Sequence, residues 1–252
     1  MQLIGILNLT PDSFSDGGKY SAAETALIYA QMMLSEGAAY IDIGAESTRP
    51  GAETITPLEE WSRMENFVKA SGNIPLSIDT RNPETAARAL KYKNVKILND
   101  VSGLENNDML ELAVKNPVDI IVMHSLTVPA DKNIVLTTPP VPTLQDWIQA
   151  KFIHLKEAGI DASRIIFDVG VGFGKTAAQS MELISAAAEL AKTCHDLGTR
   201  ILFGHSRKSF LGAEKSNKDI ETARITALLD AAGVDFARVH DIQSNHTVLQ
   251  RD

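Results

Sequence analysis

Eight stretches of this sequence read as a buried strand that runs directly into a polar or charged residue. Segments with helical periodicity separate them, and alternating strands and helices are typical of a parallel sheet. Eight such units predict a single-domain (β/α)8 TIM barrel over residues 1–252. In that fold the carboxyl ends of the strands meet at one rim, where the active site lies. The stretches are Gln2–Asn8, Tyr40–Asp42 with Glu46, Leu76–Asp79, Val95–Asp100, Ile120–His124, Arg164–Asp168, Ile201–Ser206 and Phe236–His240.

Helix starts are marked by capping residues and prolines. Ser21 with Glu24 and Thr56 with Glu59 have capping-box spacing, and Pro57 follows Thr56 at a first helical position. The patterns predict helices at 21–35, 57–70, 83–92, 108–115, 144–158, 178–196 and 219–232, with a short eighth after His240. The connection from His124 to Thr143 contains four prolines and no amphipathic pattern. A functional loop and an ordinary surface insertion are equally compatible with it.

Composition limits the partners of the chain. The 252 residues carry a formal net charge of -8, which argues against a nucleic-acid surface. The one cysteine, Cys194, cannot form an internal disulfide and lies in a helical run, so we expect a buried core thiol. A chain without disulfides suits the reducing cytoplasm. Met1 leads directly into a strand, which predicts no signal peptide, and no apolar run reaches the ~20 residues of a membrane span.

The strand ends carry two kinds of side chain. Carboxylates and amides form one group, which suits a flat, nitrogen-rich heterocycle whose N–H edge donates to a carboxylate. Cations form the other, and their place after the last two strands matches the usual anion site of this fold. Taken singly, each Asp also fits a helix N-cap and each Arg a solvated surface residue. The first group is Asn8, Asp42, Asp79, Asn99, Asp100 and Asp168, and the second is Arg49, Arg207, Lys208, Arg238 and His240.

Other motifs carry no chemistry. The glycines of 170–176 fail the phosphate-loop pattern at Val169 and the dinucleotide pattern at Lys175. His195 and His246 have no partner cluster and are interpreted as structural. The sequence shows no zinc-type cluster and no nucleophile with a base at fixed spacing. It predicts catalysis by positioning and electrostatics.

Several strings closely resemble the motifs of the dihydropteroate synthase family. They are GILNLTPDSFSDGG at residues 5–18, IDIGAESTRPGA at 41–52, SIDT at 77–80, NDVSG at 99–103, FGK at 173–175, SRKS at 206–209 and RVHD at 238–241. They occur in the family's order and cover nearly the whole chain, so the match is far more specific than a shared barrel.

The resemblance implies a transferase of folate biosynthesis. It implies that 4-aminobenzoate condenses with the dihydropterin methyl diphosphate to give 7,8-dihydropteroate and diphosphate, with Mg2+ as cofactor. It further implies a homodimer and a target of sulfonamides. By motif position, the residues expected to bind the pterin are Asp79, Asn99, Asp168 and Lys208. The residues expected to bind the diphosphate are Asn8, Thr48, Arg49, Arg238 and His240, with Asn8 as the metal ligand. The residues expected to border the aminobenzoate are Thr48, Pro50, Phe173 and Ser209. Lys208, Arg238 and His240 are the expected catalytic residues. The loops 10–18 and 48–52 are expected to close over the site.

The sequence departs from the family at a few positions. Val169 stands where a proline is usual, Ala45 replaces a glycine, and the connection after His124 is longer. Two alternative functions remain at this stage. One is a pterin-dependent methyltransferase, against which the strings at 206–209 and 238–241 argue. The other is an inactive pterin-binding paralogue, against which the intact rim residues argue.

Overall fold

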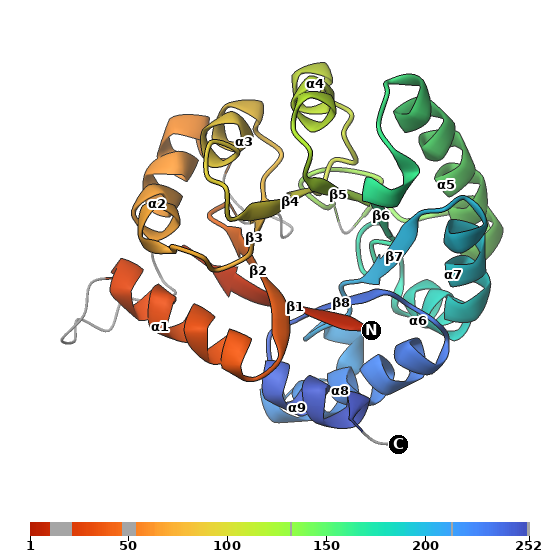
Figure 1. The fold of residues 1–252 in the computed structure, drawn as a ribbon. Coiled ribbons are helices and arrows are strands. Elements are labelled where there is room, and N and C mark those ends of the chain that lie inside the picture. Colours follow the sequence, from red (N-terminus) through yellow and green to blue (C-terminus); the bar gives the residue numbers. More distant parts are fainter. Residues whose placement is uncertain (11–21, 47–53, 132, 213, 251–252) are drawn as a thin grey trace.

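The protein is a closed barrel of eight parallel strands in sequential order (Figure 1). Its computed structural model describes residues 1–10, 22–46, 54–131, 133–212 and 214–250. The predicted (β/α)8 barrel is confirmed, and β1 closes it by pairing in parallel with both β2 and β8. The strands are β1 Gln2–Asn8, β2 Ala38–Gly44, β3 Leu76–Asp79, β4 Val95–Asp100, β5 Asp119–Met123, β6 Ile165–Asp168, β7 Arg200–Phe203 and β8 Phe236–Val239.

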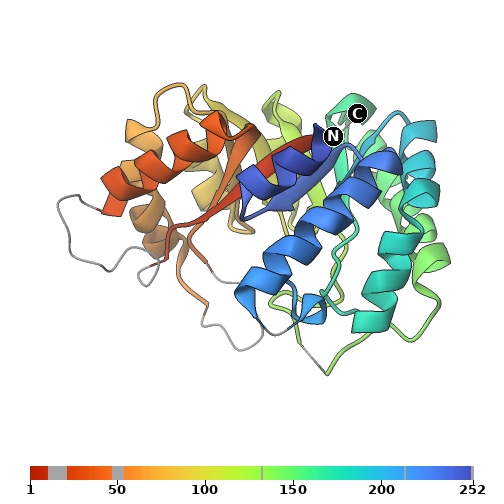
Figure 2. The same cartoon turned by 90° about the horizontal axis from the view of Figure 1, so that it is seen from below.

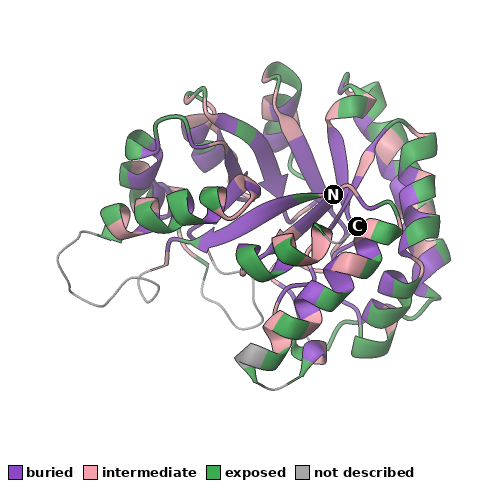
Figure 3. Ribbon diagram, turned by 60° about the horizontal axis from the view of Figure 1, so that its bottom comes forward, coloured by how far each residue is buried: buried purple, intermediate pink, exposed green. Residues whose placement is uncertain are grey.

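Helices surround the barrel and turn their exposed faces outward (Figure 3). Those in the described residues are α1 Ala22–Ser35, α2 Pro57–Ala70, α3 Pro83–Ala89, α4 Asn107–Lys115, α5 Pro140–Glu157, α6 Ala177–Ser185, α7 Ala187–Asp196, α8 Lys215–Ala231 and α9 Ile242–Leu249. Two 3-10 turns, η2 Ala162–Arg164 and η3 Ser209–Leu211, precede β6 and follow β7. No helix in these ranges has the length and apolar content to span a membrane.

Some helix boundaries differ from the prediction. The expected helix over 178–196 is broken at Ala186 (φ -94°, ψ 16°), which ends α6 and begins α7. Helix α5 begins at Pro140 rather than Leu144, because prolines are tolerated in a first helical turn. Thr56 accepts the Glu59 N–H as its motif predicts, but the Glu59 carboxylate pairs with Arg63.

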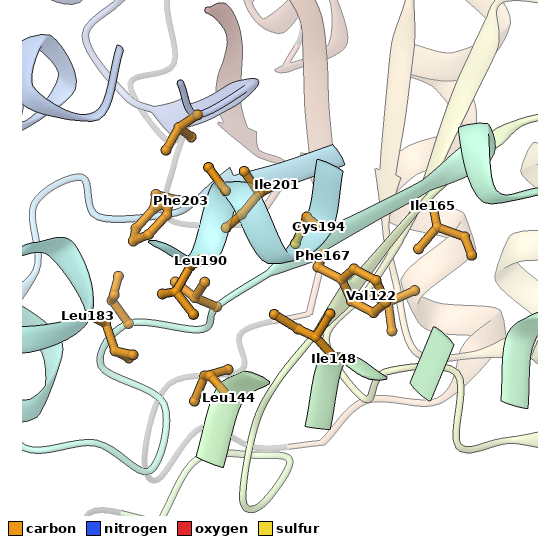
Figure 4. Packing of buried hydrophobic residues seen from close by; sticks show 14 of the residues in the cluster. Val122, Leu144, Ile148, Ile165, Phe167, Leu183, Leu190, Cys194, Ile201 and Phe203 are labelled. Atoms are coloured by element: carbon orange, nitrogen blue, oxygen red, sulfur yellow. The ribbon is translucent and has the colours of Figure 1, made fainter. Parts of the chain in front are cut away.

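The main core lies between the strands and the helices. In one part of it, shown in Figure 4, side chains of α5, α6 and α7 pack on β5, β6 and β7. Leu144 and Ile148 of α5 and Leu190 of α7 belong to this cluster and are fully buried. Cys194 is also fully buried there, and burial raises the pKa of its thiol to about 12. The expected core thiol is confirmed.

A second, smaller cluster fills the barrel itself. Its members come from six strands and pack together, which is possible only inside the cylinder: Ile4, Ile97, Ile121, Ile166, Leu202 and Phe236. Side chains of a strand point to alternate faces, so residue i+2 shares the face of residue i. The residues two positions after five of these members therefore also point inward, one step closer to the carboxyl rim. They are Asn99, Met123, Asp168, Gly204 and Arg238.

The connection after β5 lies at the end of the barrel opposite the N-terminus (Figure 2). Its described parts are 125–131 and 133–139. It is the long proline-containing connection expected from the sequence, and it lies beside the loop between β6 and α6, where Leu136 donates its N–H to the Gly174 carbonyl.

Candidate active site

A polar cavity occupies the carboxyl end of the barrel, directly above the interior apolar cluster. Its volume is about 40 Å3, room for about three waters. It contains all four residues predicted for the pterin, together with Phe173 and Arg238. The lining is Asp79, Asn99, Val101, Met123, Asp168, Gly170, Val171, Phe173, Gly204, Lys208 and Arg238.

Arg238 lies between two carboxylates in this cavity. Its Nε donates to Asp42 Oδ2 at 2.6 Å, and its Nη2 donates to Asp79 Oδ2 at 2.6 Å. Asn99 Nδ2 also donates to Asp42 Oδ1, at 3.2 Å. Burial alone would lower the pKa of the Arg238 guanidinium, but Asp42 and Asp79 outweigh it and the net shift is upward. Arg238 therefore stays charged and holds the two acids in fixed positions.

Asp79 lines the cavity and is not a helix cap. Asn82 occupies the N-cap position of α3, while the Asp79 carboxylate pairs with Arg238. Burial raises the pKa of Asp79 to about 7, Arg238 opposes the rise, and the charge of Asp42 adds to it. A carboxyl with such a pKa can accept hydrogen bonds as an anion or donate one when protonated.

Asp168 and Lys208 both line the cavity. Asp168 Oδ1 accepts the Gly170 N–H at 2.9 Å. Burial raises the pKa of Asp168, while the Gly170 N–H and the charge of Lys208 oppose the rise. Lys208 Nζ lies 4.2 Å from the centre of the Phe173 ring, so the ring stabilises the ammonium by a cation–π contact. The ring contact and the negative charge of Asp168 both favour the ammonium at this position.

The other predicted residues lie outside this lining. Asn8 is exposed at the end of β1 and Ser209 is exposed at the start of η3. His240 follows β8, and its Nδ1 lies 2.9 Å from Ser206 Oγ, which also accepts the His240 N–H at 3.2 Å. Thr48, Arg49 and Pro50 lie outside the described residues, as do the loop 48–52, Ser21 and most of the loop 10–18.

Arg207 does not join the cations of the site. Its guanidinium makes a bidentate pair with Asp219 of α8, at 2.6 and 2.9 Å. Its φ of 55° is rare for a residue with a side chain. The sequence placed Arg207 at the rim correctly but could not show that a partner twelve residues later holds it.

Sequence reasoning missed the apolar walls and the partner of the arginine. Val101 and Met123 line the cavity, and a flat ring binds between such walls. Asp42 was assigned to the rim but not to the site, although it pairs with Arg238. Strand parity could have found Met123, because it follows the interior Ile121 by two residues.

Among the described residues, no group of three or more His, Cys, Asp or Glu side chains could hold a metal ion. A protein-enclosed metal centre is therefore not part of the described structure. Mg2+ often takes only one or two protein oxygens and fills its shell with water and substrate phosphates. The exposed carboxamide of Asn8 fits that mode of binding.

A parallel barrel with a polar, charge-paired cavity at its carboxyl rim defines an enzyme-type ligand site, and its class follows from known proteins. A family model described as pterin binding enzyme matches residues 4–240. The chain is 36% identical to a dihydropteroate synthase of Neisseria meningitidis over 99% of this chain and 90% of that protein. The chain belongs to the dihydropteroate synthase family of pterin-binding enzymes, and the resemblance found in the sequence is confirmed.

Two further relatives show how the chain compares in length and in three dimensions. It is 40% identical to a probable bifunctional folylpolyglutamate synthase/dihydropteroate synthase of Halobacterium salinarum, over 96% of this chain but only 30% of that protein. A crystal structure of dihydropteroate synthase from Anaplasma phagocytophilum with bound 6-hydroxymethylpterin-monophosphate superimposes with a TM-score of 0.86. That comparison has 32% identity and covers 99% of this chain and 97% of the other.

Proposed function

We propose that this chain is a dihydropteroate synthase. It would condense 4-aminobenzoate with the 7,8-dihydropterin methyl diphosphate and release diphosphate. The observation that carries the proposal is the cavity at the carboxyl rim, in which Asp79, Asn99, Asp168 and Lys208 converge. Family membership over nearly the whole chain supports it.

The cavity has the chemistry that a pterin needs. The pterin edge is amidine-like and donates two parallel N–H bonds, which a carboxylate such as Asp168 accepts side by side. Lys208 donates to an acceptor on the ring system, and Val101 and Met123 contact its faces. A pterin edge held by Asp79 would compete with Arg238, which donates to the same carboxylate.

The reaction follows from these contacts. The aminobenzoate nitrogen uses its lone pair to form a bond to the pterin methylene carbon, while the carbon–oxygen bond to diphosphate breaks. The diphosphate leaves with that electron pair, and the nitrogen loses one proton to the solvent or the leaving group. Cations beside the leaving group stabilise the charge that develops there. Arg238 and His240 are proposed for that role, and Thr48 and Arg49 extend the proposal to residues outside the described ranges.

Mg2+ would supply further neutralisation of the diphosphate when bound. Asn8 is the proposed protein ligand, because it presents an exposed oxygen at the end of β1 on the same rim. Phe173 and Ser209, with Thr48 and Pro50, are proposed to border the aminobenzoate. The homodimer, the cytoplasmic location and residues 1–252 as one pterin-binding domain stay predictions.

The decisive experiment measures dihydropteroate formation from both substrates with Mg2+. A protein that binds the pterin but forms no product would be the inactive paralogue. Methyl transfer from methyltetrahydrofolate without diphosphate chemistry would indicate the alternative enzyme.

Asp168→Asn tests the pterin site itself. The amide cannot accept two N–H bonds on one edge, and loss of one partner of a buried charged contact costs about 3–5 kcal/mol. Calorimetric titration should therefore show at least a hundredfold weaker binding of the pterin diphosphate. Asp235→Asn is the matched control, because Asp235 pairs with His195 beside the opposite ends of β7 and β8. Equal affinities of both variants for the pterin would contradict the assignment.

A further inference from the structure

Lys175 is buried in the loop between β6 and α6, where its ammonium is surrounded by acceptors. Its Nζ lies 3.0 Å from the carbonyl oxygens of Gly170 and Phe173, 3.2 Å from the carbonyl oxygen of His124, and 2.8 Å from His124 Nδ1. An ammonium has three hydrogens, so all of its donors are satisfied by two loops. Lys175 therefore ties the loop after β6 to the end of β5.

The long connection after β5 packs on the same loop from outside. Leu136 donates its N–H to the Gly174 carbonyl at 2.8 Å, and Gln179 Nε2 donates to the Leu136 carbonyl at 2.8 Å. The Leu126 side chain lies so close over Gly174 that an added Cβ there would be 2.7 Å from Leu126 Cγ. Since no Cβ fits between them, the two loops are in direct contact with no space for a methyl group.

These contacts end at the wall of the cavity. Phe173, whose carbonyl accepts from Lys175, places its ring under the Lys208 ammonium. Lys208 also lies close to Gly172, where an added Cβ would be 3.3 Å from Lys208 Cδ. A shift of this loop would therefore move the Phe173 ring, whereas Lys208 itself belongs to the connection after β7.

We propose that Lys175 is a positioning residue of the reaction. With His124, Leu126, Gly174 and Leu136 it forms a clasp between the β5–α5 and β6–α6 connections. The clasp fixes Phe173 at the side of the cavity where the aminobenzoate binds. The proposal rests on the proposed function, and it gives the long connection of this chain a definite role: it braces the acceptor side of the site from outside.

A purely structural lysine and a positioning lysine make different predictions. The first would weaken the whole fold and both substrate sites in parallel. The second would loosen the clasp and affect the aminobenzoate side while leaving the pterin acids, Asp79 and Asp168, in place. The variant Lys175→Met separates these outcomes because it keeps an unbranched side chain of similar size and removes the ammonium. Lys151→Met is the matched control, since Lys151 is also buried but pairs with Glu105 away from the clasp.

The first measurement is amide exchange, which needs no activity. The Leu136 N–H is hydrogen-bonded across the clasp, so it should exchange at least tenfold faster in Lys175→Met than in the wild type. In Lys151→Met it should exchange at the wild-type rate. An unchanged Leu136 rate in Lys175→Met would overturn the clasp even if the protein proves to be the synthase. A wild type without synthase activity would overturn the proposed function and leave this measurement intact.

The second measurement separates the two substrates. Lys175→Met should raise the KM for 4-aminobenzoate at least tenfold, while the Kd for the pterin, measured by calorimetry, changes less than twofold. Parallel changes in both constants would show a general loss of structure and overturn the positioning role. If Lys175→Met does not fold, Leu126→Ala serves instead, because Leu126 is partly exposed. It should raise the KM for aminobenzoate at least threefold with the same unchanged pterin affinity, and an unchanged KM would overturn the proposal.

Discussion

At the scale of single residues, Arg238 determines the electrostatics of the cavity. It neutralises Asp42, which is fully buried, and Asp79 at the same time. Arg238→Ala would leave a buried charge without its partner, which costs about 3–5 kcal/mol of stability. Adding Asp42→Asn should recover part of that loss, and urea unfolding of the single and double variants measures the coupling. If the stability loss of the double variant equals the sum of the losses of the two single variants, the pair of Arg238 and Asp42 contributes nothing to stability.

Because of this pair, Arg238→Ala is a poor test of diphosphate binding. Arg238→Lys keeps the charge and loses only the second hydrogen bond. It should therefore fold better than Arg238→Ala and still weaken the thermal stabilisation that pyrophosphate gives to the wild type. An undiminished thermal shift in Arg238→Lys would argue against Arg238 as a diphosphate ligand.

Buried histidines make the protein sensitive to acid. Burial lowers the pKa of His205 to about 4 and that of His124 to about 3, with the charge of Lys175 adding to the second shift. A histidine with a lowered pKa takes up its proton only on unfolding, so its contribution to stability is complete above about pH 6.5 and is lost as the pH falls towards 4. Each such histidine contributes a slope of about 1.4 kcal/mol per pH unit in that window.

His205→Gln should remove the share of this slope that belongs to His205, whose Nε2 lies 3.0 Å from Thr226 Oγ1. The measurement is urea unfolding at several pH values between 4 and 7. Thr199→Ala, a change at another buried polar residue without a titratable group, should lower stability and keep the wild-type slope. An unchanged slope in His205→Gln would contradict the assignment.

At the scale of elements, the loop between β6 and α6 depends on glycine. Gly170 has a φ of +62°, and an added Cβ would lie 2.0 Å from the His124 carbonyl oxygen. Gly72 has a similar φ of +57° but no atom within 4 Å of its added Cβ. Gly72→Ala should cost only the backbone strain of about 1–2 kcal/mol. Gly170→Ala adds a steric clash and should cost clearly more in thermal unfolding, whereas equal costs would show that the loop moves freely.

The sequence predicted the strands better than the helix boundaries. A strand end is marked by an apolar run that meets a polar residue, and parity then sets which side chains face inward, as for Asp168 after Ile166. The break at Ala186 has no such mark, because alanine favours helix on both sides. The capping box of Thr176 and Gln179 is not among the predicted helix starts, although its two residue types and their spacing fit the motif.

The sequence also could not predict which distant side chains pair with each other. Nothing in the local pattern distinguishes Arg207, which is held by Asp219, from Arg238, which enters the cavity. The partner of an arginine depends on the three-dimensional path of the chain. Strand parity gives only the direction in which the arginine side chain points. The clasp was hidden for the same reason, since Lys175 and His124 lie 51 residues apart.

At the scale of the whole molecule, the pterin and diphosphate sites should be coupled. A pterin edge held by Asp79 would displace the Arg238 N–H from that carboxylate and free it to pair with an anion. Each ligand should then tighten binding of the other by the same factor, typically five- to 150-fold. Calorimetry of pyrophosphate with and without 6-hydroxymethylpterin, and the reverse titration, measures it. The factor should shrink in Asp79→Asn, and independent binding in the wild type would contradict the coupling.

Along these strands the cavity residues follow the interior apolar cluster by two positions. This spacing restricts where the chain can gain or lose residues. One residue inserted before Asp168 within β6 would reverse the facing of the strand beyond it, sending the acid towards the helices. The same insertion after the strand would only lengthen a loop, and the connection at 125–139 is an example that keeps its strand intact. Insertions and deletions in descendants of this sequence should therefore fall almost entirely on the carboxyl side of the last inward-facing residue of each strand. Counting their positions in natural variants tests this expectation.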